Sequence, residues 1–385
     1  MFCISPYQIL FTRRRLPLSF KNKLVHCTLI LIFILTCING STLNAITLES
    51  VSAYTDLKDY TSISNFNEFR TAISIATTNL QSKVILKTPN SDLNSYSQIL
   101  KQYPEIDSYK LECLTKAPNK NVLTVTLNYK QVYKLIHAQT SQLAKSRLNT
   151  SDLQLLNKAN QIVKQITTEQ MSDYDKELVI HDYIINNTSY DYDSLTHNTN
   201  NNVIYTAAGA LLNHRAVCEG YSEACMLLLN LCHINSKIVY GSSDTTNHAW
   251  NLVELDNKWY HLDVTFDDPL VLNNNQRIET LSYNYFNVPD TILEQDHQWD
   301  RQKYPQASSM EQNYFYKHNL IANDYNEFKS IVLSEIQKGK TEIQCYVTNY
   351  DVTKYDLSFV LEHCKRVNYS TPLNKSGCIK LNLLQ

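Results

Sequence analysis

Two stretches near opposite ends of the chain resemble each other, and this repeat constrains the fold more than any other feature. Residues 66–70 read FNEFR and recur at 325–329 as YNEFK, and the same offset aligns Asp92 with Asp351. In each copy the apolar residues are spaced first as in a helix, then as in a strand, and then as in a second helix and strand. The repeat predicts two small α/β units on either side of a central region.

The expected elements of the two units follow from this spacing. The first unit should contain helices over 66–80 and 93–103 and strands over 83–87 and 122–129. The second should contain helices over 325–337 and 355–365 and strands over 341–347 and 378–383. Neither unit carries side chains grouped as in a catalytic site, so we expect both to bind partners or to act as spacers.

The first 42 residues differ from the rest of the chain. A basic stretch that ends at Lys23 precedes an apolar run from Leu24 to Ile38, and a short polar segment follows. This order is typical of a secretory signal peptide, and the run is shorter than the ~20 residues needed to span a bilayer. A cleaved signal peptide, an uncleaved N-terminal membrane anchor and a lipid-modified Cys37 are the three interpretations. All three predict a secreted or cell-surface protein.

Composition and cysteine count set further bounds. The sequence is 43% hydrophobic and 19% charged, as in globular proteins, and its net charge of −2 predicts no attraction to nucleic acid. Seven cysteines follow the N-terminal segment, an odd number without a CxxC pair, which is neither a disulfide framework nor a zinc ribbon. At least one thiol of a chain expected to be exported must therefore lack a partner within the molecule.

One cysteine of the central region stands at the start of an expected helix. Helices are expected over 150–166 and from Cys218 to about Cys232. A helix N-terminus carries partial positive charge and unpaired N–H groups, which favour a thiolate and can hold an oxyanion. Gly220 lets another group approach this backbone closely. By position alone, Cys218 is equally well a buried core thiol. Cys225 and Cys232 follow at intervals of seven on one helix face and are interpreted as core residues.

A hairpin supplies two partners for this cysteine. Strands are expected over 236–241, 248–255 and 259–264. The Asp256-Asn257 turn joins the last two, and counting outward from it brings His248 and Asp263 nearly level. If the helix N-terminus packs over that end, Cys218 is the nucleophile, His248 its base and Asp263 the group that orients the histidine. His261 is either a rival base or a half-buried strand residue.

The remaining histidines and acidic residues give no sign of a metal site or a cofactor. No HExxH, CxxC or acidic calcium loop is present, so a metal-dependent hydrolase has little support. His214, His233 and His297 have no partner that the sequence reveals, and they are interpreted as surface or structural residues.

Three motifs around these residues resemble the bacterial transglutaminase-like family. They read AVCEGY at 216–221, NHAWN at 247–251 and WYHLDVTFDDP at 259–269. Segments that resemble the preceding helix and loop and the closing part of the family lie at 181–183, 190–193, 285–288 and 296–297. The resemblance covers about residues 170 to 304. Two positions depart from the family pattern, because His214 replaces a usual turn glycine and Phe266 a common tryptophan.

The resemblance implies a papain-like core, in which a helix bearing the cysteine packs on an antiparallel sheet that carries the histidine and the aspartate. By resemblance, the catalytic triad falls on Cys218, His248 and Asp263. Candidates for oxyanion binding or for support of the triad are Tyr205, Gly220 and Trp250.

We thus predict an α+β protein in four parts. Residues 1–42 form the signal peptide or anchor, 43–140 the N-terminal α/β unit, 141–305 the transglutaminase-like catalytic domain and 306–385 a C-terminal α/β unit that resembles the first. The family includes amide-crosslinking transamidases, cysteine proteases and deglycosylating amidases, all of which attack a carbonyl through a thioester. The resemblance implies an exported enzyme that hydrolyses or transamidates amide bonds of proteins or peptides, including cell-wall peptides. The alternative is a non-catalytic surface protein that binds through the same fold.

Overall fold

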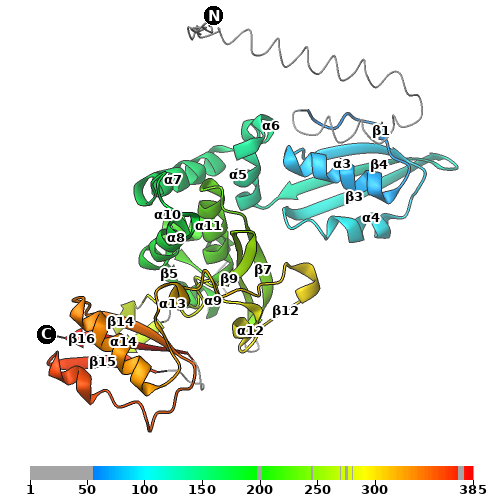
Figure 1. The fold of residues 1–385 in the computed structure, drawn as a ribbon. Helices are drawn as coiled ribbons and strands as arrows, with labels where there is room; N and C mark the ends of the chain where they lie inside the picture. Colours follow the sequence, from blue (N-terminus) through cyan, green and yellow to red (C-terminus); the bar gives the residue numbers. More distant parts are fainter. Residues whose placement is uncertain are drawn as a thin grey trace, which may run out of the picture.

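The computed structural model describes residues 55–196, 202–243, 246–268, 270–273, 276–279, 281–371 and 377–384. These residues form three units, each with a four-stranded sheet, and the chain passes through them in sequence order (Figure 1). The segment predicted to direct export, residues 1–42, lies outside the described residues. Within the described part of the chain, no helix is both long and apolar enough to cross a bilayer.

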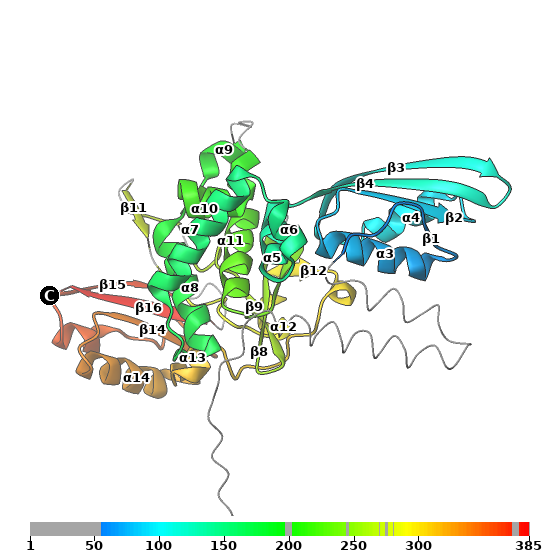
Figure 2. The same ribbon diagram turned by 90° about the horizontal axis from the view of Figure 1, so that it is seen from above.

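The N-terminal unit packs two helices on one face of a sheet with strand order β1-β2-β4-β3 (Figure 2). Its elements are β1 Thr61–Ser62, α3 Phe66–Thr78, β2 Lys83–Thr88, α4 Leu93–Leu100, β3 Ile106–Ala117 and β4 Lys120–Tyr129. Alternate strand residues such as Val84 and Val125 meet Phe69 and Tyr96 of the helices in one apolar core. This core is separate from that of the central region.

The C-terminal unit has the same topology, with strand order β13-β14-β16-β15. Its elements are β13 Ile321–Ala322, α14 Tyr325–Gln337, β14 Glu342–Val347, η3 Ser358–Glu362, β15 Arg366–Ser370 and β16 Gly377–Leu384. In both sheets the first two strands are parallel and the other pairs antiparallel. The matching helices α3 and α14 are capped alike, by Asn65 and Asp324. The repeat in the sequence therefore corresponds to a repeat in the fold.

The structure of these units differs from the expectation in one helix and in four strands. The helix expected over 355–365 is only the short η3, because Asp356 accepts hydrogen bonds from the N–H and the hydroxyl of Ser358 and so forms a local turn in place of a helical one. Strands β1, β3, β13 and β15, which form the edges of the two sheets, were not expected. Strands β1 and β13 are only two residues long, too short to show a pattern. Strands β3 and β15 carry many exposed polar residues, so their sequences lack the regular alternation of a half-buried strand.

The central region consists of helices followed by an antiparallel sheet with strand order β12-β7-β8-β9. The helices are α5 Gln131–Thr140, α6 Gln142–Ser146, α7 Thr150–Ile166, α8 Asp173–Asn187, α9 Tyr192–Thr196, η1 Asn202–Tyr205, α10 Ala207–Asn213 and α11 Cys218–Leu231. The sheet strands are β7 Ser236–Ser243, β8 Thr246–Leu255, β9 Lys258–Leu262 and β12 His297–Trp299. Smaller elements are β5 Ser189–Tyr190, β6 Arg215–Ala216, β10 Leu270–Asn273, β11 Gln276–Glu279, α12 Asp290–Leu293, η2 Arg301–Lys303 and α13 Tyr314–Lys317.

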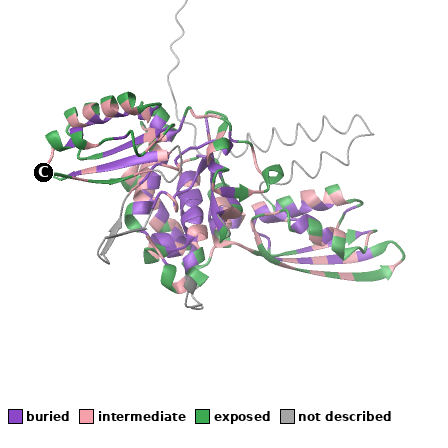
Figure 3. Ribbon diagram, turned by 90° about the horizontal axis from the view of Figure 1, so that it is seen from below, coloured by how far each residue is buried: buried purple, intermediate pink, exposed green. Residues whose placement is uncertain are grey.

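Helix α11 is the centre of this region (Figure 3). Every residue from Gly220 to Leu229 is buried, including the polar Ser222 and Glu223, so no side of this stretch faces solvent. It packs against α5, α7 and α8 on one side and against β7 and β8 on the other. The predicted hairpin of β8 and β9 is confirmed, since Asp256 and Asn257 both have left-handed φ angles and Glu254 pairs with Trp259.

Candidate active site

Cys218 is the first residue of α11, and it is half-buried. Val217 before it is extended, with φ −108° and ψ −179°, and its N–H donates to the carbonyl of Ile204 in η1 at 2.9 Å. The N–H groups of a helix's first turn have no partner within the helix, and they give this end a partial positive charge. The sulfur therefore lies where a thiolate is stabilised.

Gly220 allows η1 and the residues after it to lie against the first turn of α11. A Cβ atom at this position would lie 2.5 Å from the carbonyl oxygen of Ile204 and 3.0 Å from that of Thr206. Such an approach of two backbones leaves no room for a side chain. Tyr205, predicted as an oxyanion donor, is the last residue of this η1 segment and is 40% exposed.

The structure brings His248 and Asp263 together from the two strands of the hairpin. His248 lies on β8, and Asp263 directly follows the last residue of β9. The distance from His248 Nε2 to Asp263 Oδ2 is 2.6 Å, and both side chains are buried. Cys218 also lies close enough to His248 to contribute to the raised pKa of its imidazole. The three residues that the sequence predicted as a triad are thus brought together at one end of α11 and the hairpin.

The electrostatics of this series favour a charged histidine. Burial lowers the His248 pKa, but Asp263 and Cys218 outweigh it and raise the pKa to about 10. Burial in turn raises the Asp263 pKa, but hydrogen bonds and charge from His248 and His297 hold it well below its usual range. At neutral pH the pair is therefore an imidazolium and a carboxylate, and the imidazolium stabilises a thiolate beside it.

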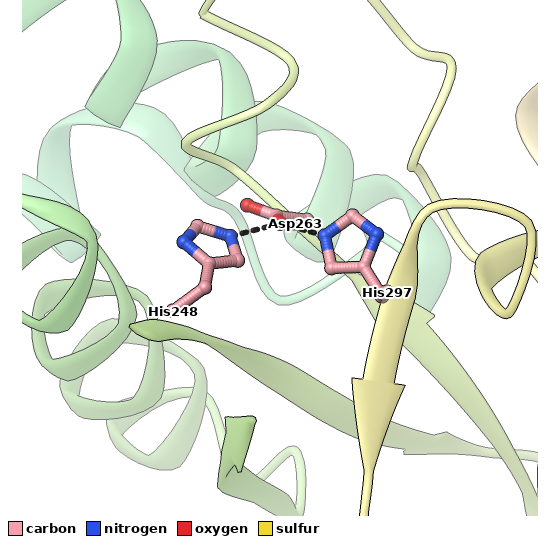
Figure 4. A group of neighbouring side chains, drawn as sticks. All are labelled: His248, Asp263 and His297. Atoms are coloured by element: carbon pink, nitrogen blue, oxygen red, sulfur yellow. Dashed lines mark hydrogen bonds and ion pairs between the residues drawn. The ribbon is translucent and has the colours of Figure 1, made fainter. Parts of the chain in front are cut away.

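A second histidine, His297, contacts the same carboxylate, although its sequence context suggested only a surface or structural residue (Figure 4). His297 Nε2 lies 3.1 Å from Asp263 Oδ2, while Asp263 Oδ1 accepts the N–H groups of Thr265 and Phe266 at 3.0 and 3.1 Å. His297 lies on β12, which pairs with β7 in a register that sets it opposite Ser243. The only signal in the sequence was the likeness of residues 296–297 to the closing segment of the family.

His261, the rival base, has both ring nitrogens engaged elsewhere. Its Nδ1 accepts the indole N–H of Trp250 at 3.0 Å, and its Nε2 lies 2.9 Å from Asp290 Oδ1. His261 is also fully buried rather than half-buried, and it is therefore a structural residue and not the base for Cys218. Trp250 stacks on His248 with ring centroids 5.8 Å apart, so it supports the imidazole while its N–H serves His261.

The two departures from the family pattern are visible in the geometry. His214 has a left-handed φ of 58° at the C-cap of α10, a conformation that favours glycine. Its Nδ1 lies 2.7 Å from the carbonyl oxygen of Asn187, a contact that a glycine would lack. The Phe266 ring lies against both imidazoles, with centroids 4.7 Å from His248 and 4.8 Å from His297.

Tyr190 and Glu219 near the nucleophile were not proposed as site residues from the sequence. Burial, together with the charge of Cys218, raises the pKa of Tyr190 on β5. The carboxylate of Glu219 binds the Lys130 ammonium at 3.0 Å and the Tyr240 hydroxyl at 2.9 Å. Because Lys130 directly follows β4, this ion pair ties the N-terminal unit to the residue next to Cys218.

His248, Asp263 and His297 also form a possible metal site. Among the described His, Cys, Asp and Glu residues, they are the one group of three whose possible metal-ligand atoms lie within 4.8 Å of one another. The 2.6 Å contact between His248 and Asp263 is the length of a charge-assisted hydrogen bond. Two ligands bound to one zinc ion at ~2.0–2.1 Å lie farther apart, at ~3.3 Å in a tetrahedral site. We therefore interpret this cluster as a hydrogen-bonded network of charged groups.

Residues 160–264 match the family model of the transglutaminase-like superfamily. Over these residues the chain is similar to this superfamily. The match spans α11, β8 and β9 and so includes all three residues of the sulfur, imidazole and carboxylate series. No curated protein matches the sequence at a significant level.

Several solved structures resemble parts of the chain. A TGase is 15% identical with a TM-score of 0.29, and the match covers 52% of this chain and 55% of the TGase chain. A candidate cysteine protease from Cytophaga hutchinsonii is 16% identical with a TM-score of 0.25, covering 46% and 70%. A candidate protease from Parabacteroides distasonis is 9% identical with a TM-score of 0.24, covering 79% and 66%. The chain thus spans about half the length of the TGase, and at such identities the likeness concerns the fold alone.

Proposed function

We propose that the transglutaminase-like domain is a cysteine enzyme that acts on amide bonds of proteins or peptides. The observation that carries this proposal is the series of Cys218 sulfur, His248 imidazole and Asp263 carboxylate at the N-terminus of a buried helix. Burying charged groups is costly because they lose their hydration. Charged groups with shifted pKa values beside a half-buried thiol are typical of catalytic sites, which favours an enzyme over a protein that only binds.

The proposed reaction has two halves. The Cys218 thiolate attacks the carbonyl carbon, and N–H groups at the start of α11 stabilise the oxyanion. The C–N bond then breaks, the amine leaves with a proton from the His248 imidazolium, and a thioester remains on Cys218. Water or a primary amine attacks the thioester, His248 takes the proton of this nucleophile, and the Cys218 thiolate is released. Water gives hydrolysis, and a lysine-like amine gives transamidation.

We also propose that the enzyme acts at the cell surface or in the medium. The basic stretch, the apolar run of residues 24–38 and the polar segment after it support export. Proteins of the surface and peptides of the cell wall are accordingly the substrates we propose.

A non-catalytic surface protein is the second candidate. The observation that favours it is the pair of flanking units, which share one topology and lie outside the family match. The enzymatic function requires the Cys218 sulfur as a nucleophile, whereas the binding function does not. If Cys218→Ser retains the full biological effect of the protein, the binding function is correct and the enzymatic one is wrong.

A product assay tests the enzymatic function directly. The mature chain is incubated with a library of glutamine-containing peptides, with and without a primary amine, and the products are identified by mass spectrometry. Amine adducts indicate a transamidase, cleaved peptides a protease, and ammonia release alone an amidase. Cys218→Ser should abolish all products, whereas Cys113→Ser, which changes a half-buried thiol of the N-terminal unit, should leave them unchanged. Products that persist in Cys218→Ser would contradict the proposal.

A further inference from the structure

We propose that His297 is a positioning residue of the active site, which holds the Asp263 carboxylate against His248 and carries a positive charge itself. This inference rests on the function proposed above for Cys218. Figure 4 shows the two imidazoles on either side of the carboxylate, to which both are hydrogen-bonded. His297 is 1% exposed, so these contacts are made away from solvent.

The charge of His297 follows from its two partners. Its Nε2 lies 3.1 Å from Asp263 Oδ2, and its Nδ1 lies 2.5 Å from Asp296 Oδ1. A neutral imidazole carries one N–H, so it can donate to one carboxylate, whereas an imidazolium donates to both. The second oxygen of Asp296 accepts the hydroxyl of Tyr285, which leaves Asp296 as an acceptor. These hydrogen bonds raise the His297 pKa although burial lowers it, in keeping with a charged ring.

The second histidine completes the hydrogen bonding of the Asp263 carboxylate. One oxygen accepts two backbone N–H groups, from Thr265 and Phe266, and the other accepts two imidazole N–H groups. A carboxylate offers about four acceptor positions, so all are used and the group cannot rotate without losing several bonds. His248 is thereby held in one orientation, with its remaining nitrogen left for Cys218.

The sheet brings His297 to this place. Strand β12 pairs with β7, and β7 pairs with β8, so that Gly241 lies opposite both Trp299 and His248. A Cβ atom at Gly241 would lie 2.1 Å from the carbonyl oxygen of Gln298, so glycine is required for this close approach. The position of His297 is therefore built into the strand pairing.

The ionisable groups that face His297 are few. The carboxylates of Asp263 and Asp296 both contact its ring, His248 is cationic with its ring centroid 5.4 Å away, and Tyr285 lies 5.5 Å away by the same measure. His261 is neutral because its Nδ1 accepts the Trp250 N–H, and burial and the charge of His297 both lower its pKa. Without the His297 charge, the surroundings of the nucleophile would be more negative by one charge. A thiolate at Cys218 would then form less readily.

Alkylation of Cys218 by iodoacetamide as a function of pH tests this inference in the full mature chain. The rate at the Cys218 peptide is followed by mass spectrometry between pH 4 and 10. In His297→Gln, which keeps an N–H donor but removes the charge, the acid side of the profile should move up by about one pH unit, making labelling at acid pH about tenfold slower. Asp296→Asn should move it the other way, to lower pH and by less, because Asp296 is partly exposed.

His261→Gln is the matched control, since it exchanges one buried neutral side chain for another and should leave the profile in place. Shifts of the pH profile in opposite directions for His297→Gln and Asp296→Asn support the inference, because a general loss of packing would shift both profiles in the same direction. Coincident profiles for the wild type, His297→Gln and Asp296→Asn overturn it, and if His297→Gln does not fold, the sign of the Asp296→Asn shift decides. If wild-type Cys218 reacts only at the pH of an ordinary thiol, the proposed function fails, and this inference fails with it.

Discussion

Asp263→Asn is the substitution for which the structure gives the sharpest expectation. Asparagine has the shape of aspartate, and its carbonyl oxygen can still accept the N–H groups of Thr265 and Phe266. Its NH2 group then faces the N–H groups of His248 and His297 where Oδ2 now accepts them. The N–H groups of both imidazoles would then face another hydrogen-bond donor. The negative charge of Asp263, which keeps His248 protonated, would also be lost.

The size of the effect follows from the His248 pKa. It is about 10, against an ordinary value of 6.5. At 1.36 kcal/mol for each tenfold change, its surroundings stabilise the imidazolium by on the order of 5 kcal/mol, and Asp263 is the largest favourable contribution. Without the charge of Asp263, the effect of burial on the His248 pKa dominates and favours the neutral imidazole. An ordinary thiol with a pKa of about 8.5 is thiolate in about one molecule in 300 at pH 6.

We therefore expect Asp263→Asn to slow the alkylation of Cys218 at pH 6 by roughly two orders of magnitude. At about pH 9.5, where any thiol is largely ionised, the variant and the wild type should agree to within about threefold. Asp290→Asn is the matched control, because Asp290 binds the other buried histidine of the hairpin, His261, at 2.9 Å. It should leave the pH 6 rate unchanged. Equal rates at pH 6 for Asp263→Asn and the wild type would show that Asp263 does not govern the nucleophile.

Two further substitutions test the packing and the buried charges of the domain. In Gly220→Ala, the new Cβ atom would lie 2.5 Å from the Ile204 carbonyl oxygen. We expect this contact to lower the free energy of unfolding by roughly 1–3 kcal/mol, partly offset by ~1 kcal/mol of helix propensity, and to slow the labelling of Cys218 at pH 7. An unchanged melting temperature and labelling rate would contradict the packing argument. Burial raises the Glu177 pKa to about 8, above its ordinary 4.5, so this group contributes stability that is present below about pH 4.5 and lost as pH rises toward 8. Glu177→Gln, whose carbonyl can still accept the Asn287 amide, should therefore gain stability relative to the wild type between pH 5 and pH 8 in denaturant unfolding, and a difference independent of pH would refute the assignment.

Local patterns in the sequence sufficed for those parts of the site that lie close together along the chain. The turn Asp256-Asn257 sets the pairing of β8 with β9, and this register brings His248 to Asp263. The placement of Cys218 at a helix start also follows from neighbouring residues. The repeat predicted helix α14 with its observed bounds, because a capping residue and regular apolar spacing are both local signals.

Edge strands and one helix could not be predicted in this way. Strand β3 lies at the edge of its sheet and exposes polar residues such as Lys110 and Glu112, so no clear alternation marks it. In the second unit, the turn at Asp356 replaces most of the expected helix, because a side chain that bonds to nearby backbone competes with helical hydrogen bonds.

The sequence by itself was enough to predict Cys218 as the nucleophile, His248 as its base and a transglutaminase-like central domain, since these predictions depend on motifs and on a two-residue turn. Only the tertiary structure decided which histidines share a carboxylate. His261 is two residues from Asp263 yet bonds to Asp290, whereas His297, 34 residues away, bonds to Asp263. The physical reason is that His297 reaches the site through the pairing of β12 with β7, and the register of strands so far apart in the sequence depends on the packing of the whole sheet.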